Sequence, residues 1–129
     1  MKKELIITIF IIAIVIIGNI ITQNYTKKCI EAMNDNLIEL KQEIKKQDKE
    51  SQVINFQIEN IKDEWDNMQE KLAFYVEHDE LEKVEAQLFM IKGNIEVKRY
   101  DESLPELEKC IFILEHIEDK CALDIKNLF

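Results

Sequence analysis

Glycine and proline are nearly missing from this chain, whose 129 residues contain two glycines and one proline. Sandwiches, barrels and glycine-rich phosphate-binding folds need many residues at special backbone angles, so this composition excludes them. Basic residues are also few, 17 against 26 acidic ones, and the net charge is −9. Because nucleic acid attracts Lys and Arg and repels an acidic surface, we expect no nucleic-acid partner. The chain is therefore predicted to be all-α.

Charge is absent between Leu5 and Thr26, and residues 5–21 are apolar except for Thr8, Gly18 and Asn19. A helix of this uncharged length extends about 33 Å, and the hydrocarbon core of a bilayer is about 30 Å thick. The sequence therefore predicts an N-terminal membrane anchor at residues 1–26, which contacts the lipid bilayer through residues 5–26.

A cleaved secretory signal is the alternative, since it shares the short basic start formed by Lys2 and Lys3. The apolar run exceeds the core of about 7 to 15 residues typical of such signals, and no small-x-small cleavage site follows Ile21. We therefore favour an uncleaved signal anchor. The long C-terminal part can cross largely regardless of its charges, so the short basic end decides the orientation. This predicts a single-pass protein of the cytoplasmic membrane, with its N-terminus inside and its C-terminal domain outside.

Residues 27–129 form the predicted extracytoplasmic domain, with 15 basic and 25 acidic residues and a net charge of −10. Apolar residues recur there every three or four positions, which is the spacing of one helix face. The four stripes are Ile30, Met33, Leu37, Leu40 and Ile44; Ile54, Ile58, Ile61, Trp65, Met68, Leu72 and Tyr75; Leu81, Val84, Leu88, Ile91 and Ile95; and Leu107, Cys110, Ile111, Leu114, Ile117, Cys121 and Ile125. We expect helices at about 27–47, 51–77, 79–98 and 103–126.

The apolar seam turns polar between Gln47 and Ser51, and this leaves two architectures open. In the first, the transmembrane helix continues into the first domain helix, and Asp48 or Ser51 caps a new helix after a break. The product is a small antiparallel bundle of three to four helices. In the second, a continuous rod reaches about Glu77, forms a coiled coil with a partner helix and is followed by a helical hairpin.

The later helices have their own expected start signals. Asp79 followed by Glu82, and Ser103 followed by Glu106, have the spacing of a capping box, with Pro105 in the first turn of the last helix. Residues 110–114 are apolar without interruption, so we expect neighbouring helices to enclose this segment.

Trp65 and the cysteines are interpreted as structural residues. Trp65 lies on the second stripe and is expected in the core. Cys110 and Cys121 are eleven residues apart on one predicted helix. That spacing is about 16 Å, whereas bridged Cα atoms lie within about 7 Å, so we expect buried free thiols. Cys29 follows the apolar run, and we hypothesise a disulfide with Cys29 of a second chain.

Two polar clusters, Glu77 to Glu80 and Glu115 to Asp119, are the places where chemistry is conceivable. The first is interpreted as a loop and helix cap, and the second as a surface contact between His116 and Asp119. Helical di-iron proteins need Glu three residues before His, but Tyr75 and Ile113 occupy those positions. We therefore predict no catalytic, cofactor-binding or metal residue, no cofactor and no enzymatic activity.

Several short segments together suggest a family. They are Trp65, Leu72, Glu77-His78-x-Glu80, Leu114-Glu115-His116-Ile117 and Asn127-Leu128-Phe129. In these the chain resembles a family of small single-pass membrane proteins of spore-forming Gram-positive bacteria, catalogued as a domain of unknown function. The resemblance covers nearly the whole chain and implies an extracytoplasmic helical domain that folds back near Asp48. It implies no activity, cofactor or catalytic residue.

Two functions remain open after this reading. The first is a non-enzymatic, membrane-anchored helical interaction or structural protein of the cell envelope, with another membrane or envelope protein, or a second copy, as its partner. The second is an extracytoplasmic, sensor-like domain that binds a small ligand or a cation. Nearly unbroken apolar stripes leave few positions for the convergent polar groups of a ligand site, so the first function is favoured.

Overall fold

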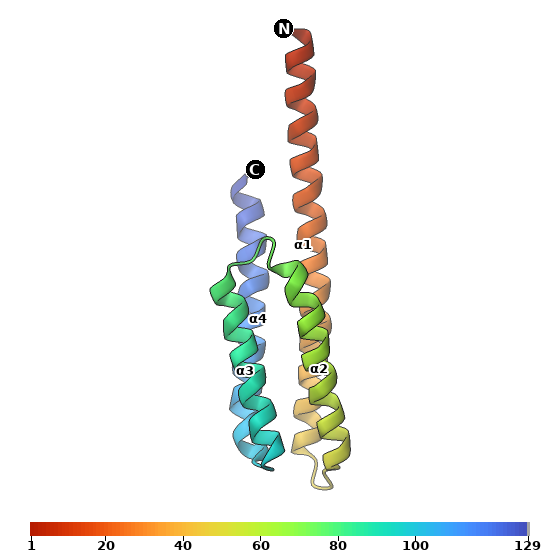
Figure 1. Ribbon diagram of the computed structural model, residues 1–129, viewed down its shortest axis with the longest axis vertical. Helices are drawn as coiled ribbons and strands as arrows, with labels where there is room; N and C mark the ends of the chain where they lie inside the picture. The colour runs from red at the N-terminus through yellow and green to blue at the C-terminus, as the bar shows by residue number, and fades with distance from the viewer. Residues whose placement is uncertain (129) are drawn as a thin grey trace.

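Four helices make up the described part of the protein. The computed structural model describes the backbone of residues 1–128 and the side chains of residues 1–123, and no strand occurs in that part. The helices are α1 (Lys2–Lys45), α2 (Ser51–Leu72), α3 (His78–Glu96) and α4 (Tyr100–Leu128). Figure 1 shows that the C-terminal half of α1 packs beside the other helices, while its N-terminal half projects alone.

The helices form an antiparallel bundle in which each packs against its two neighbours. α1 contacts α2 and α4, and α3 contacts the same two helices. The connections, residues 46–50, 73–77 and 97–99, are short, which favours antiparallel neighbours. The backbone leaves the helix at Lys46, where ψ is 145°, so the continuous rod is excluded. The predicted bundle is thus confirmed, with the second half of α1 as its fourth helix.

The predicted apolar stripes form the core of this bundle. Every stripe position on α1, on α2 up to Leu72 and on α3 is buried, as are Leu107, Cys110, Leu114 and Ile117 of α4. Trp65, 1% exposed, is the largest fully buried side chain, which confirms its core role. Ile125 lies outside the part whose side chains are described.

Residues 5–21 of α1 contrast with this core. All of their large apolar side chains from Leu5 to Ile21, except the partly buried Ile16, are between 48% and 65% exposed. The most apolar window of α1 has a mean hydropathy of 2.9 and no residue buried inside the protein. A helix of this length and composition can cross a membrane, and a signal sequence near the N-terminus meets the same criteria.

The start of α2 at Ser51 is as expected, but the expected caps are wrong in detail. α3 begins at His78 after Glu77, and neither α2 nor α3 has a capping side-chain hydrogen bond. α4 begins at Tyr100, so Ser103 lies inside the helix. Its hydroxyl donates to the carbonyl oxygen of Tyr100 at 2.5 Å, because a buried serine satisfies its hydroxyl on the preceding turn.

Because α4 begins at Tyr100, the predicted position of Pro105 in the first turn is also wrong. Pro105 lies in the second turn of the helix instead of the first. Likewise α2 ends at Leu72, where the amide of Val76 donates to the carbonyl oxygen of Leu72 at 2.8 Å. Tyr75 therefore belongs to the α2–α3 connection and not to a helix that reaches residue 77.

The expectation that residues 110–114 are enclosed is wrong for Phe112, which is 68% exposed. Cys110 and Leu114 both face the core, and Phe112 is two residues from each, or about 200° around the helix axis. Ile111 and Ile113 are partly buried beside the core. An unbroken apolar run on an outer helix therefore still has one side chain that points to solvent.

Candidate functional site

The α2–α3 connection, residues 73–77, lies at one end of the bundle together with Thr26 of α1 and the last turns of α4. We call this the α2–α3 end. Thr26 donates its hydroxyl to the carbonyl oxygen of Thr22 at 2.8 Å, and its Oγ1 lies 2.6 Å from the hydroxyl oxygen of Tyr75. The Tyr75 hydroxyl is therefore the donor in this second bond, since the Thr26 hydroxyl has only one proton. The bond joins the connection to α1.

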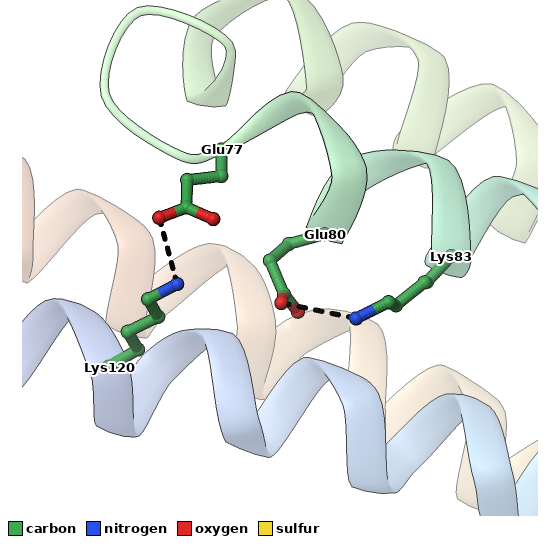
Figure 2. A network of polar contacts seen from close by, with 4 residues as sticks. All are labelled: Glu77, Glu80, Lys83 and Lys120. Atoms are coloured by element: carbon green, nitrogen blue, oxygen red, sulfur yellow. Dashed lines mark hydrogen bonds and ion pairs between the residues drawn. The ribbon is translucent and has the colours of Figure 1, made fainter.

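One ion pair joins the start of α3 to α4 at the same end, and a second lies within α3. Figure 2 shows the Glu77 carboxylate directed at the Lys120 ammonium, 3.0 Å away, and Glu80 directed at Lys83 on its own helix, 3.3 Å away. The Glu80 side chain is only 10% exposed, so its charge needs this partner. Glu77 and Glu80, which the sequence singles out, are thus engaged with lysines.

A small cavity of about 110 Å³ lies between these side chains. Its lining residues are Tyr75, Val76, Glu77, Glu80, Ile117, Lys120 and Cys121. Pockets for organic ligands usually measure about 300 to 1,000 Å³, so this one has room only for water or a small ion. Lys120, which lines the cavity, pairs with Glu77, and Lys83 pairs with Glu80, so both carboxylate charges are already offset.

The two histidines stay outside this cavity. His78 Nε2 lies 2.9 Å from Glu82 Oε1, one turn along α3, and both side chains are more than half exposed. His116 and Asp119 are exposed, and in residues 1–123 no ion pair joins them, contrary to the expected contact. No group of three His, Cys, Asp or Glu residues in the described part of the chain is placed to hold a metal ion.

The three cysteines occupy different environments. Cys110 is 0% exposed, and burial raises the pKa of its thiol from about 9 to about 12, which confirms the expected buried thiol. Cys121 is partly exposed at the cavity, so the expectation of full burial is wrong there. Cys29 is partly exposed and packs against the core, and its intermolecular disulfide stays a prediction.

The Thr26–Tyr75 bond is a feature that sequence reasoning missed. The two residues are 49 positions apart, and hydroxyl groups leave no periodic signal. Burial raises the pKa of the Tyr75 phenol. The ion pair between Lys120 and Glu77 was also missed, because no sequence pattern near Lys120 indicates that its side chain reaches Glu77.

A comparison with protein families matches residues 20–128 to the domain of unknown function DUF4363. The chain belongs to the DUF4363 family. The match includes the whole bundle and only the last residues of the apolar run, so the unit that the family model matches is the helical bundle. No curated protein and no solved structure matches the chain. The uncharacterised family expected from the resemblance is thereby confirmed.

The opposite end of this DUF4363 domain has a larger hollow of about 320 Å³. Its lining residues are Lys49, Lys98, Arg99, Tyr100, Asp101 and Glu102. Lys49 Nζ lies 5.8 Å from the centre of the Tyr100 ring, and Arg99 pairs with Glu102 at 3.6 Å. Charges of both signs therefore line the hollow, and Arg99 and Glu102 pair with one another, whereas ligand pockets are mostly apolar with a few polar groups.

Proposed function

We propose that this DUF4363 protein is a non-enzymatic, membrane-anchored helical protein of the cell envelope that acts by binding another protein. The exposed apolar half of α1 anchors it, and the bundle meets the partner. The partner is another membrane or envelope protein, or a second copy of the chain. The single observation that supports this proposal is that α1 continues without a break from its exposed apolar half into the bundle.

Continuity of α1 favours an anchor over a cleaved signal. Cleavage after the apolar run, near residue 21, would cut inside the helix that buries Thr26, Ile30 and Met33 in the bundle. An uncleaved α1 keeps this helix continuous into the bundle, and this supports retention of residues 1–26 in the mature protein.

The proposed orientation places the short basic N-terminus inside and the bundle outside. Lys2 and Lys3 precede the apolar run, and the positive-inside rule acts mainly through such short segments. The resemblance to single-pass proteins of spore-forming Gram-positive bacteria supports an envelope of that type. The acidic bundle then faces the exterior with a net charge of −10 over residues 27–129.

Site-specific crosslinking in living cells tests the proposal. A photoreactive amino acid replaces Phe112 or Phe56, which are 68% and 66% exposed on different helices, in the full-length chain. We expect a crosslinked product from at least one of them, and a second, differently tagged copy distinguishes self-association from a foreign partner. Recovery of the monomer alone from both positions contradicts the proposal.

A ligand-binding function is the alternative, and the hollows of about 320 and 110 Å³ are where it would act. A thermal-shift measurement on the full chain in detergent micelles, with divalent cations added one at a time, decides between the two. A rise in melting temperature that disappears in Glu80→Gln supports cation binding at the cavity. An unchanged melting temperature contradicts it and favours the interaction protein.

A further inference from the structure

Three large side chains are exposed at the α2–α3 end of the bundle. Phe74 is 88% exposed, and Tyr75 beside it is 38% exposed. Leu123 of α4 is 57% exposed. Outside the apolar half of α1, no other described phenylalanine is as exposed as Phe74. An aromatic ring at the tip of a connection contributes nothing to the core, so the structure itself does not account for it.

Contacts to α1 show how far along the helix axis this connection lies. The Tyr75 hydroxyl bonds Thr26, the last residue of the uncharged run. Lys71, in the last turn of α2, lies with its Nζ 5.6 Å from the centre of the Tyr25 ring. Phe74 is therefore level with the point at which the uncharged part of α1 ends.

The end of α4 reaches the same level. Tyr75 and Cys121 line the same small cavity, so Cys121 lies at the level of the α2–α3 connection. Leu123 is two residues further along α4, or about 3 Å closer to the apolar run. In Figure 1 the last turns of α4 extend past the α2–α3 connection, in the direction of the N-terminal half of α1.

We propose that the α2–α3 end is a second contact with the lipid bilayer, in which Phe74 and Leu123 enter the interface beside α1. This inference rests on the proposed function, because it requires that residues 5–26 span the membrane. Aromatic side chains favour the boundary between headgroups and hydrocarbon, where an apolar ring and a polar tip are both accommodated. Tyr25 and Tyr75 lie at the same level and have this character.

A bilayer fits this surface better than a protein partner does. The lipid that surrounds residues 5–21 ends near Thr26, which is the level of the exposed Phe74 ring. The other exposed phenylalanines of the bundle, Phe56, Phe89 and Phe112, lie away from this level along their helices. Single exposed apolar residues of that kind are ordinary on protein surfaces.

The contact would also fix the orientation of the bundle relative to the membrane. With α1 across the bilayer and a second contact at Phe74, the long axis of the bundle is perpendicular to the membrane plane. The connection at residues 46–50 is then about 30 Å from the interface, at about 1.5 Å per residue of α1 beyond Thr26. That far end is the part presented to a partner.

Tryptophan quenching by lipid tests the contact in the full-length protein. Phe74→Trp and, as the matched control, Phe56→Trp are reconstituted into phosphatidylcholine vesicles whose acyl chains are brominated near the headgroup. Phe56 is also highly exposed but lies sixteen residues before the end of α2, about 24 Å away along the axis. The parent chain supplies the baseline, because its single tryptophan, Trp65, is buried in the core.

We expect brominated lipid to reduce the emission of Phe74→Trp and to leave that of Phe56→Trp and the parent unchanged. Vesicle flotation of the same samples reports on α1 independently. Chains that float without quenching at position 74 overturn the lipid contact and leave the anchor intact. Equal quenching at positions 74 and 56 also overturns it, because the bundle then lies flat on the membrane. Chains that do not float overturn the anchor and the contact together.

Discussion

The two halves of α1 are one continuous helix with two different apolar patterns. Between residues 5 and 21 nearly every position is apolar, and the side chains are exposed around the whole circumference. From Thr26 to Ile44 apolar residues recur every three or four positions, and those positions are buried. Charged or polar residues occupy most of the remaining positions of this second half, among them Glu31, Lys41 and Glu43.

The difference shows which neighbour each half requires. A helix that is apolar on one stripe is covered by its two neighbouring helices, which in this bundle supply matching stripes. A helix that is apolar all round needs an apolar environment on every side, and the other described helices do not surround residues 5–21. The pattern of residues 5–21 is therefore that of a helix able to cross a membrane, whereas that of residues 26–44 is explained by packing against protein.

Truncation of the same kind of side chain in the two halves gives the largest expected effect. Leu37→Ala removes a side chain that is 0% exposed, and we expect the free energy of unfolding of the bundle to fall by about 2 to 5 kcal/mol. Ile14→Ala, at a position 54% exposed, should leave it unchanged. Thermal unfolding in detergent micelles, followed by circular dichroism, measures both. Equal losses would mean that residues 5–21 belong to the folded bundle.

A charge introduced into each half of α1 should affect membrane insertion only in the N-terminal half. Ile14→Lys puts an ammonium near the centre of the apolar run, at a cost of about 2.5 to 3.5 kcal/mol for membrane insertion. We expect a smaller fraction of the chain in the membrane pellet after alkaline extraction. Ile38→Lys, at a position 42% exposed on the bundle, is the control and should not change that fraction. Retention of both variants contradicts a transmembrane role for residues 5–21.

Much of the fold was predictable because burial leaves a periodic trace. Most positions of the four stripes and the core position of Trp65 follow from spacing alone, and the structure has them. The break after Lys45 did not follow from spacing, which left a continuous rod open. Helix starts were not predictable in the same way. Ser103 and Asp79 have the residue types of caps, but the helices begin earlier because the preceding residues also accept helical geometry.

The candidate site was harder to foresee than the fold. Periodicity says which face of a helix is buried, but not which polar groups meet between residues far apart in sequence. The pairs Thr26–Tyr75 and Glu77–Lys120 join segments 49 and 43 positions apart, and each depends on how far the helices extend along one another. The exposure of Phe74 was also missed, because the apolar stripe continues to Tyr75 and predicted a longer helix, whereas α2 ends at Leu72.

The buried thiol of Cys110 predicts a pH dependence that belongs to the core. Below pH 9 the thiol is protonated in both states; above it the unfolded chain loses the proton, while the folded chain, with a pKa of about 12, keeps it. Stability should therefore fall as pH rises from about 9 toward 12, by about 1.4 kcal/mol per pH unit. Urea unfolding of the parent and of Cys110→Ala at pH 8 and pH 10 measures this loss. The variant should lose less than the parent, Cys29→Ala should match the parent, and equal slopes in all three would refute the assignment.

The smallest expected effect lies at the boundary between the two halves, where the Tyr75 hydroxyl donates to Thr26. Thr26→Val keeps the shape of the side chain but removes the oxygen, so the free energy of unfolding should fall by about 0.5 to 1.5 kcal/mol. Thr8→Val is a matched control, because Thr8 also donates to the carbonyl four residues before it, Glu4, but lies in the exposed half. If the boundary is where protein contacts give way to lipid, only the first variant shifts the unfolding midpoint in micelles. Equal shifts would place the change of environment elsewhere along α1.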